Sequence, residues 1–291
     1  MSRPDAHTTG DTQPLLRQVR SYSVSEVAPY INWLYFYHAW QVGPGKEREN
    51  LRADADRMLQ RLDQAYRTHA VTALYSACSD HDDIVLGAER IPCLRQQTLG
   101  PDGCCLSLAD FVRPAQGAVA AADDNVAGRV ALFAATVDTA METDLRSDAY
   151  ERMLSQTLAD RLAEATAEVL HQEVRRALWG YAPDERLGTD ALLRGDYQGI
   201  RPAVGYPSLP DTSLNFLLER LLRMSEIGIR LTETGAMRPH ASVSGLMLAH
   251  PAARYFELGR IDEAQLADYA RRRGVPMALM RRFLAERLDN K

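Results

Sequence analysis

The longest regular pattern of hydrophobic positions lies between residues 148 and 179. Apolar residues recur there at intervals of three or four, the spacing of one helix face; they are Leu154, Leu158, Leu162, Ala165 and Val169. Gly180 follows at the position of a C-terminal cap. The pattern therefore predicts one long helix over this segment.

Hydrophobic spacing and capping residues predict further helices over residues 46–68, 212–228, 262–273 and from about 276 onward. The third of these begins with Asp262 and has Gln265 three positions later, which together form a capping box. Another helix is expected to start near Ser21, where Ser23 or Ser25 can act as the cap. Residues 1–20 are polar and carry scattered charge, so we expect a mobile tail.

Short runs of β-prone residues are interleaved with these helices. They are residues 70–77, 83–86, 130–136, 229–232, 242–248 and 255–258. This interleaving is compatible with an α+β domain over residues 21–291, in which helices pack around a twisted, mostly antiparallel β-sheet.

The segment from Tyr30 to Trp40 is unusually aromatic. Six of its eleven residues are aromatic, which a fully solvated helix would not carry. Two interpretations remain open: a helix packed into the core, or one edge of a ligand groove. Asn32 lies within this segment and offers an uncharged polar group.

The long predicted helix carries a second stripe, which is polar. Asp160, Glu164, Glu168 and His171 follow one another at helical spacing. From periodicity alone, such a stripe is usually the solvated face of a helix. We therefore expect these side chains to face solvent, unless a ligand recruits them.

Residues 199–211 fit neither a helix nor a regular strand. Three prolines fix φ and remove backbone donors, and two glycines permit backbone angles that other residues avoid. The resulting stiff loop carries Arg201, a planar fork suited to a carboxylate, and Tyr206, a flat ring with a polar tip. These groups suit a zwitterionic or nucleoside-like ligand; the alternative is a connector whose arginine pairs with a surface carboxylate.

Composition excludes several functional classes. The net charge of −5 gives no basic surface for nucleic acid, and no apolar stretch approaches the ~20 residues of a membrane span. We therefore expect a cytoplasmic protein with no nucleic-acid or membrane partner. Its four cysteines lack ligand spacing and are predicted to be reduced, and its seven histidines show no metal-site pattern. The sequence contains no recognisable catalytic acid, base or nucleophile.

One apparent motif is attributed to coincidence. The run from Asp5 to Gly10 places His7 in the Asp-x-His-x-x-Gly pattern by which cobalamin-binding modules present a histidine to cobalt. That pattern belongs after a parallel strand, and no strand is predicted before His7. We therefore expect no cobalamin site in this chain.

Several motifs together resemble the activation domain of cobalamin-dependent methionine synthase. They are Arg201-Pro202-Ala203-Val204-Gly205-Tyr206-Pro207, residues 231–237 and 241–245, and the runs at 158–165, 179–183 and 268–274. The resemblance covers most of the chain from residue 21 and is strongest from residue 150. It implies that S-adenosylmethionine is bound through the Arg-x-x-x-Gly-Tyr motif. The implied contacts are Arg201, Ala203, Gly205, Tyr206, Tyr255, Phe256, Glu164 and Asn32.

The resemblance also implies a role. The chain would be the reactivation subunit of a split methionine synthase, with cobalamin in trans on a separate methionine synthase core and electrons from a flavodoxin-type donor. No complete activity is expected of the chain alone.

Two single positions and one four-residue run depart from the family pattern. Asn32 stands where the family has an acidic residue, Gly195 stands where one is common, and the run from Thr212 to Asn215 replaces His-Thr-Glu-Lys. These departures keep open a non-catalytic S-adenosylmethionine-binding or regulatory protein with the same fold. A structural scaffold without any ligand is a third possibility.

Overall fold

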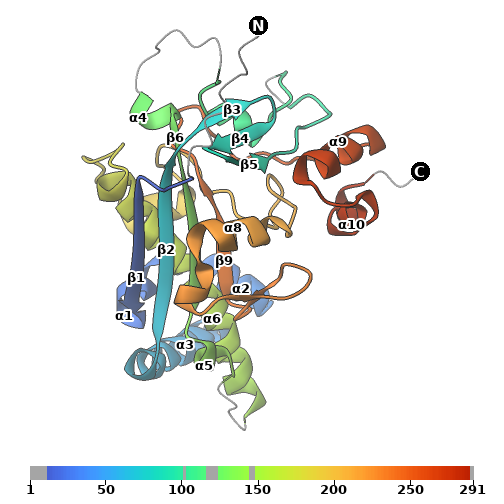
Figure 1. Ribbon diagram of the computed structural model, residues 1–291. Coiled ribbons are helices and arrows are strands. Elements are labelled where there is room, and N and C mark those ends of the chain that lie inside the picture. The colour runs from blue at the N-terminus through green and yellow to red at the C-terminus, as the bar shows by residue number, and fades with distance from the viewer. Residues whose placement is uncertain (1–11, 101–102, 116–123, 144–147, 289–291) are drawn as a thin grey trace, which may run out of the picture.

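A four-stranded antiparallel sheet forms the centre of the computed structural model, which describes residues 12–100, 103–115, 124–143 and 148–288. Its strands, in spatial order, are β1 (Leu16–Ser23), β2 (Arg67–Ser76), β6 (Arg129–Val137) and β9 (Ser242–Met247). Most residues of β2 and nearly all of β6 are buried. Both faces of the sheet must therefore be covered (Figure 1).

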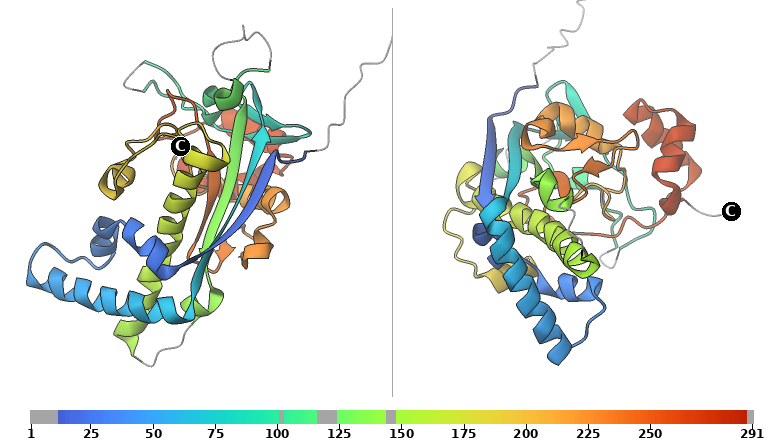
Figure 2. Two further views of the ribbon diagram at one scale, coloured as in Figure 1. Left: turned by 90° about the vertical axis from the view of Figure 1, so that its left-hand side faces the viewer. Right: turned by 90° about the horizontal axis from the view of Figure 1, so that it is seen from below.

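Helices cover one face of the sheet. The longest is α6 (Ala149–Glu173), which continues as the π-helical turn η3 (Val174–Leu178). It packs beside α3 (Lys46–Ala65) and the short elements α1 (Val24–Val27), η1 (Ala28–Tyr30) and α2 (Trp33–Ala39). Figure 2 shows α3 and α6 on the same side of the sheet. The predicted long helix and the amphipathic helix at 46–68 are both confirmed.

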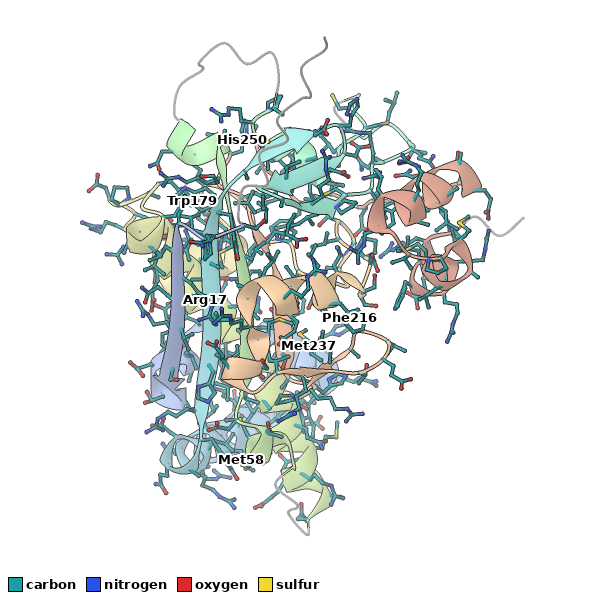
Figure 3. The ribbon with its side chains drawn as sticks, in the orientation of Figure 1. Arg17, Met58, Trp179, Phe216, Met237 and His250 are labelled. Atoms are coloured by element: carbon teal, nitrogen blue, oxygen red, sulfur yellow. The ribbon has the colours of Figure 1, made fainter. Side chains whose placement is uncertain are left out.

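The opposite face is covered by smaller elements. They are α8 (Leu214–Leu222), η4 (Met224–Ile227), η2 (Leu108–Phe111) and a small antiparallel sheet of β3 (Cys78–Asp80), β4 (Asp83–Leu86) and β5 (Glu89–Pro92). Arg17 of β1 donates from Nη2 to the carbonyl of Leu222 at 2.7 Å and ties the edge of the sheet to α8 (Figure 3).

The C-terminal helices α9 (Glu263–Arg273) and α10 (Met277–Phe283), with the turn η5 (Ala285–Arg287), form a third apolar cluster at one side of the molecule. The remaining elements are α4 (Asp124–Ala127), α5 (Thr139–Thr143), α7 (Thr189–Arg194), β7 (Arg230–Leu231) and β8 (Met237–Arg238). No helix within the described ranges is both long enough and apolar enough to cross a membrane.

Two predicted boundaries are corrected at the N-terminal end. The prediction of a mobile tail over residues 1–20 is wrong for residues 16–20, because β1 begins at Leu16 and pairs with β2. The helix expected near Ser21 begins only at Val24, with Ser23 as its cap. The apparent motif around His7 lies outside the described residues.

A strand predicted at 255–258 is also wrong, since that segment has no regular structure. Its carbonyl at Glu257 accepts from the Gln96 side chain at 2.7 Å rather than from a neighbouring strand. The cap predicted at Asp262 is confirmed, because its carboxylate accepts from the backbone N–H of Gln265 at 2.8 Å. In a capping box, the Gln265 side chain would accept from the backbone N–H of Asp262. Here the Gln97 side chain accepts from that N–H instead, at 2.6 Å.

Candidate functional site

The loop at residues 199–211 runs along the free edge of β9. Leu248 exchanges two backbone hydrogen bonds with Ile200, at 2.9 and 3.0 Å, and the N–H of Val204 donates to Ser244 at 2.8 Å. This pairing makes the loop locally extended, so alternate side chains point to opposite faces. Ile200 and Val204 accordingly join the core beneath α8, whereas Ala203 packs toward the α6 face.

Gly245 makes this close approach possible. A Cβ at residue 245 would lie 2.2 Å from the carbonyl oxygen of Pro202 and 2.8 Å from the Cα of Ala203. No side chain fits in that space. The glycine therefore sets how closely the loop, and with it Arg201, lies against the sheet.

The loop then makes a tight turn at Gly205, whose φ of +91° favours glycine. The N–H of Gly205 donates to the carbonyl of Leu209 at 2.8 Å, and the N–H of Leu209 donates to the carbonyl of Tyr206 at 2.9 Å. These bonds turn the chain back on itself and hold Tyr206 at the outside of the loop, where it is half exposed.

The end of the loop is anchored by a buried network. The carboxylate of Asp211 is fully buried and accepts from the Tyr269 hydroxyl at 2.9 Å and from Nε of Arg273 at 3.2 Å. It also accepts from the Ser213 hydroxyl at 2.6 Å. Burial, reinforced by the charge of Asp211, raises the pKa of Tyr269 well above its usual value. Helix α9 thus anchors the end of the loop at Asp211.

Two adjoining cavities of about 360 and 440 Å³ lie between the loop, α6 and α2. Both are lined by Tyr35, Glu164, Arg201, Tyr206 and Tyr255. The first cavity is also lined by Tyr30, Asn32, Arg161, Ala165, Glu168, Tyr197 and residues 192–195; the second by Pro202, Ala203, Pro207, Ser208, Val243, Phe256 and Glu257. Such volumes fall in the range of small-molecule sites.

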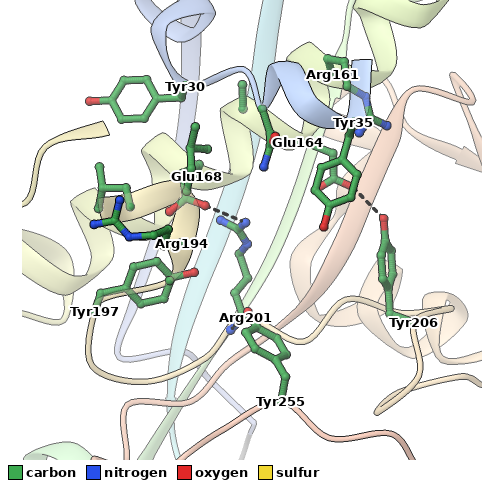
Figure 4. A pocket seen from close by; sticks show the side chains of 15 residues that line it. Tyr30, Tyr35, Arg161, Glu164, Glu168, Arg194, Tyr197, Arg201, Tyr206 and Tyr255 are labelled. Carbon is green, nitrogen blue, oxygen red and sulfur yellow. Dashed lines mark hydrogen bonds and ion pairs between the residues drawn. The ribbon is translucent and has the colours of Figure 1, made fainter. Parts of the chain in front are cut away.

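Arg201 and Glu168 form a buried ion pair in the wall of the first cavity. Nη2 of Arg201 donates to Oε2 of Glu168 at 3.1 Å, and the two side chains are only 13% and 8% exposed. Burial opposes the charged guanidinium and lowers its pKa, but the Glu168 carboxylate together with Tyr197, Tyr255 and Glu164 outweighs burial, so the pKa of Arg201 is raised. The backbone N–H of Arg201 donates to the Tyr255 hydroxyl at 2.9 Å, which fixes the base of this side chain (Figure 4).

This pair retains unused hydrogen-bonding capacity. Nη1 of Arg201 and Oε1 of Glu168 are buried and have no hydrogen-bond partner among the described residues. Buried polar groups are ordinarily hydrogen-bonded, and each group left unsatisfied is unfavourable by about 1–3 kcal/mol. A polar ligand that satisfies them is therefore favoured.

Tyrosines surround the mouth of the cavities. Tyr35, Tyr206 and Tyr255 are each more than half exposed, and the Tyr206 hydroxyl donates to Oε1 of Glu164 at 2.9 Å (Figure 4). The negative charge of Glu164, followed by burial, raises the pKa of Tyr206 to about 12. Tyr206 is therefore a neutral donor at physiological pH, and it holds Glu164 at the rim.

Buried charged and aromatic side chains lie behind the cavity wall beside the ion pair. Arg175 is fully buried, forms a bidentate pair with Glu185 at 2.7 and 2.8 Å, and lies 4.0 Å from the centre of the Tyr197 ring. The fully buried His171 ring contacts Tyr197 edge-on with centroids 4.9 Å apart. Burial, and then the charges of Arg175 and Arg201, lower the pKa of His171 well below its usual value. His171 is therefore neutral in the folded protein at neutral pH.

The structure brings most of the predicted site residues together. Those that line the cavities are Arg201, Ala203, Tyr206, Tyr255, Phe256, Glu164 and Asn32, whereas Gly205 shapes the turn. Asn32 has a second role, because its Oδ1 accepts from the N–H of Leu34 at 3.1 Å and caps α2. Gly195 also lines the first cavity and ends α7 with a φ of +78°.

Sequence reasoning missed Glu168 as a site residue. The expectation that the polar stripe of α6 faces solvent is wrong for Glu168 and His171, since both are buried. One signal was present: Glu168 is surrounded in sequence by Ala165, Ala167 and Leu170. A helix that is apolar on every side is usually buried, so an acid within it needs a partner.

A comparison with known families decides the relationship. The family model of the vitamin B12 dependent methionine synthase activation domain matches residues 23–274. The chain belongs to this family. An activation-domain structure described as the MetH reactivation domain bound to AdoHcy is 33% identical, with a TM-score of 0.87, and the match covers 98% of this chain and 95% of that one. The predicted α+β fold of helices around a mostly antiparallel sheet is thereby confirmed.

One of the positions expected to depart from the family pattern can also be located. Asn215, within the run from Thr212 to Asn215, is buried and donates from Nδ2 to the carbonyl of Gly235 at 2.8 Å. It also accepts from the Ser244 hydroxyl at 2.6 Å. Asn215 therefore links the turn at Gly235 to β9. In the part of the chain that is described, no group of three or more His, Cys, Asp or Glu side chains is arranged to hold a metal.

Proposed function

We propose that this activation domain binds S-adenosylmethionine in the paired cavities and supports reductive methylation of cob(II)alamin to methylcobalamin on a separate methionine synthase core. The observation that carries the proposal is the buried Arg201–Glu168 pair with its unused donor and acceptor. It lies beside an aromatic-lined cavity, so the site fits a ligand with one zwitterionic end and one flat heterocyclic end.

The residues divide between the two ends of the ligand. Arg201 would hold the carboxylate, since a guanidinium is a planar fork of donors. The second cavity would hold the adenosine, with Ala203, Tyr255 and Phe256 as its wall. Glu164, held at the mouth by Tyr206, supplies negative charge that favours the sulfonium over a neutral thioether.

S-adenosylmethionine would supply the activated methyl group and leave as S-adenosylhomocysteine; the acceptor would be the partner's cob(II)alamin after its reduction by one electron from a flavodoxin-type donor. The domain itself needs no acid or base for this transfer. Its residues bind, orient and shield the donor, and the Tyr206 hydroxyl keeps its proton because its pKa is about 12. The cytoplasm is the proposed setting.

The test combines this protein with a cobalamin-loaded methionine synthase core, a reducing system and S-adenosylmethionine. Cob(II)alamin absorbance is expected to fall as methylcobalamin accumulates, and omission of the domain is expected to prevent this. Calorimetric titration with S-adenosylmethionine is run first. If the titration releases no heat and S-adenosylhomocysteine does not compete with S-adenosylmethionine, the proposed binding of S-adenosylmethionine is contradicted.

A second candidate is a regulatory protein that binds S-adenosylmethionine without supporting reactivation. The uncharged Asn32 favours it, because its Oδ1 is already engaged as a helix cap and no carboxylate stands at that position. Binding without methylcobalamin formation on the cognate core would support this candidate over the first.

A further inference from the structure

We propose that Glu168 accepts the α-ammonium group of the ligand, so that Glu168 and Arg201 together recognise an amino-acid zwitterion. This inference rests on the proposed binding of S-adenosylmethionine and assigns the residue that determines specificity for its amino-acid end. Family resemblance pointed instead to Asn32 and Glu164.

The first argument is capacity. A carboxylate can accept about four hydrogen bonds, and Glu168 accepts one, from Nη2 of Arg201. A guanidinium has five N–H donors, of which Arg201 uses one for this pair. An incoming carboxylate and ammonium have complementary needs, because the first only accepts and the second only donates. A zwitterion therefore fits this pair better than an anion or a cation alone.

The second argument is that the other two candidate acceptors, Asn32 and Glu164, are less suited to the ammonium. Oδ1 of Asn32 already accepts from the backbone of α2, and this uncharged amide offers an ammonium no opposite charge. Oε1 of Glu164 accepts from Tyr206 at the exposed mouth. The carboxylates that line the first cavity are Glu164 and Glu168, and Glu168 is the one paired with Arg201. A ligand whose carboxylate meets Arg201 has its ammonium, two bonds away, nearest to Glu168.

The third argument is spacing along α6. Glu164 and Glu168 are one turn apart, and the helix rise of about 1.5 Å per residue separates them by roughly 6 Å. In S-adenosylmethionine the ammonium and the sulfonium are separated by four bonds of roughly 1.5 Å each. The two carboxylates can therefore serve the two cations separately, with Glu168 at the buried ammonium and Glu164 at the sulfonium near the mouth.

The test uses three ligands against the wild type and two matched variants, Glu168→Gln and Glu164→Gln. The ligands are S-adenosylmethionine, S-adenosylhomocysteine, which lacks the positive sulfonium, and the desamino analogue of S-adenosylhomocysteine, which keeps the carboxylate and lacks the amine. Affinities are measured by calorimetric titration, and folding is checked by thermal unfolding.

Glu168→Gln is expected to weaken S-adenosylmethionine and S-adenosylhomocysteine by the same factor, about ten- to hundredfold. The same substitution is expected to leave the desamino analogue unchanged. Glu164→Gln is expected to weaken S-adenosylmethionine more than S-adenosylhomocysteine. These results would assign the ammonium to Glu168 and the sulfonium to Glu164.

Equal loss of the desamino analogue in Glu168→Gln would overturn the proposal, since Glu168 would then act only by holding Arg201. The proposal would also be overturned if Glu164→Gln, rather than Glu168→Gln, removed the difference in affinity between S-adenosylhomocysteine and its desamino analogue. If Glu168→Gln does not fold, the wild type decides, because equal affinity for S-adenosylhomocysteine and its desamino analogue would exclude any ammonium acceptor. Failure of the wild type to bind all three ligands would refute the proposed function, a distinguishable result.

Discussion

Replacing Arg201 by alanine tests the site at its centre and has two separable effects. Arg201 and Glu168 are 13% and 8% exposed, so the substitution removes one member of a buried ion pair. A carboxylate left buried and unpaired destabilises a protein by about 3–5 kcal/mol. The ligand also loses its charge-assisted contact, which contributes about 1.5–3 kcal/mol. The dissociation constant of S-adenosylmethionine is then expected to rise roughly ten- to hundredfold.

The design separates these effects. Arg201→Lys keeps a positive charge beside Glu168 and should retain stability, while restoring affinity only in part because lysine is a point charge. The double variant Arg201→Gln with Glu168→Gln removes both charges, so it should recover stability without recovering binding. Arg194→Ala is the matched control, because Arg194 lines the same cavity but is 63% exposed and pairs with Asp196 at 2.8 Å.

Affinity is measured by calorimetric titration at a temperature where denaturant curves show each variant to be folded. Arg194→Ala is expected to change the dissociation constant less than threefold, in keeping with a surface ion pair of about 0–1 kcal/mol. A folded Arg201→Ala variant with wild-type affinity would refute the placement of the ligand carboxylate.

Three further substitutions probe the neighbourhood of the site. Asn32→Asp keeps the helix cap and adds a negative charge, so S-adenosylmethionine should bind more tightly in titrations at low salt and the gain should shrink at high salt; a gain independent of salt would contradict an electrostatic origin. Gly245→Ala should lower both stability and affinity, because its Cβ would lie 2.2 Å from the Pro202 carbonyl oxygen, and unchanged affinity would show that the loop is not positioned by β9. Because the pKa of His171 is lowered in the folded protein, the unfolded chain takes up a proton at His171 at a higher pH than the folded protein does. The stability contributed by neutral His171 is therefore fully present above about pH 6.5 and is lost as the pH falls. Unfolding free energies measured against pH should show a shallower acid loss in His171→Phe, and no such change in His81→Asn, whose parent side chain is 96% exposed.

Local patterns were sufficient wherever local physics decides the structure. The period of Leu154, Leu158 and Leu162 predicted α6, because only one face of a helix need be apolar. The composition of residues 199–211 predicted a shaped loop, and its family motif predicted Arg201 and Tyr206 as site residues. Both side chains do line the cavities, although their contacts with a ligand remain predictions.

The rest depends on contacts between distant segments. Glu168 sits in a stripe that looks solvated by periodicity, and it is buried because a loop more than thirty residues later carries Arg201 to it. The segment at 255–258 has strand-forming side chains but does not pair with β9, since the loop at 199–211 already occupies that edge. Neither the burial of Glu168 nor the missing strand at 255–258 can be predicted from a short stretch of sequence.

The anchoring of Asp211 by helix α9 changes how mutational data on this domain should be interpreted. Tyr269 touches neither cavity, yet its hydroxyl and the Arg273 guanidinium hold the carboxylate at which the ligand loop ends. Loss of either group would remove one partner from the buried Asp211 carboxylate and weaken the anchor at this end of the loop. A screen that scores only ligand binding would therefore assign Tyr269 to the binding site, whereas a paired measurement of unfolding would identify it as part of the frame.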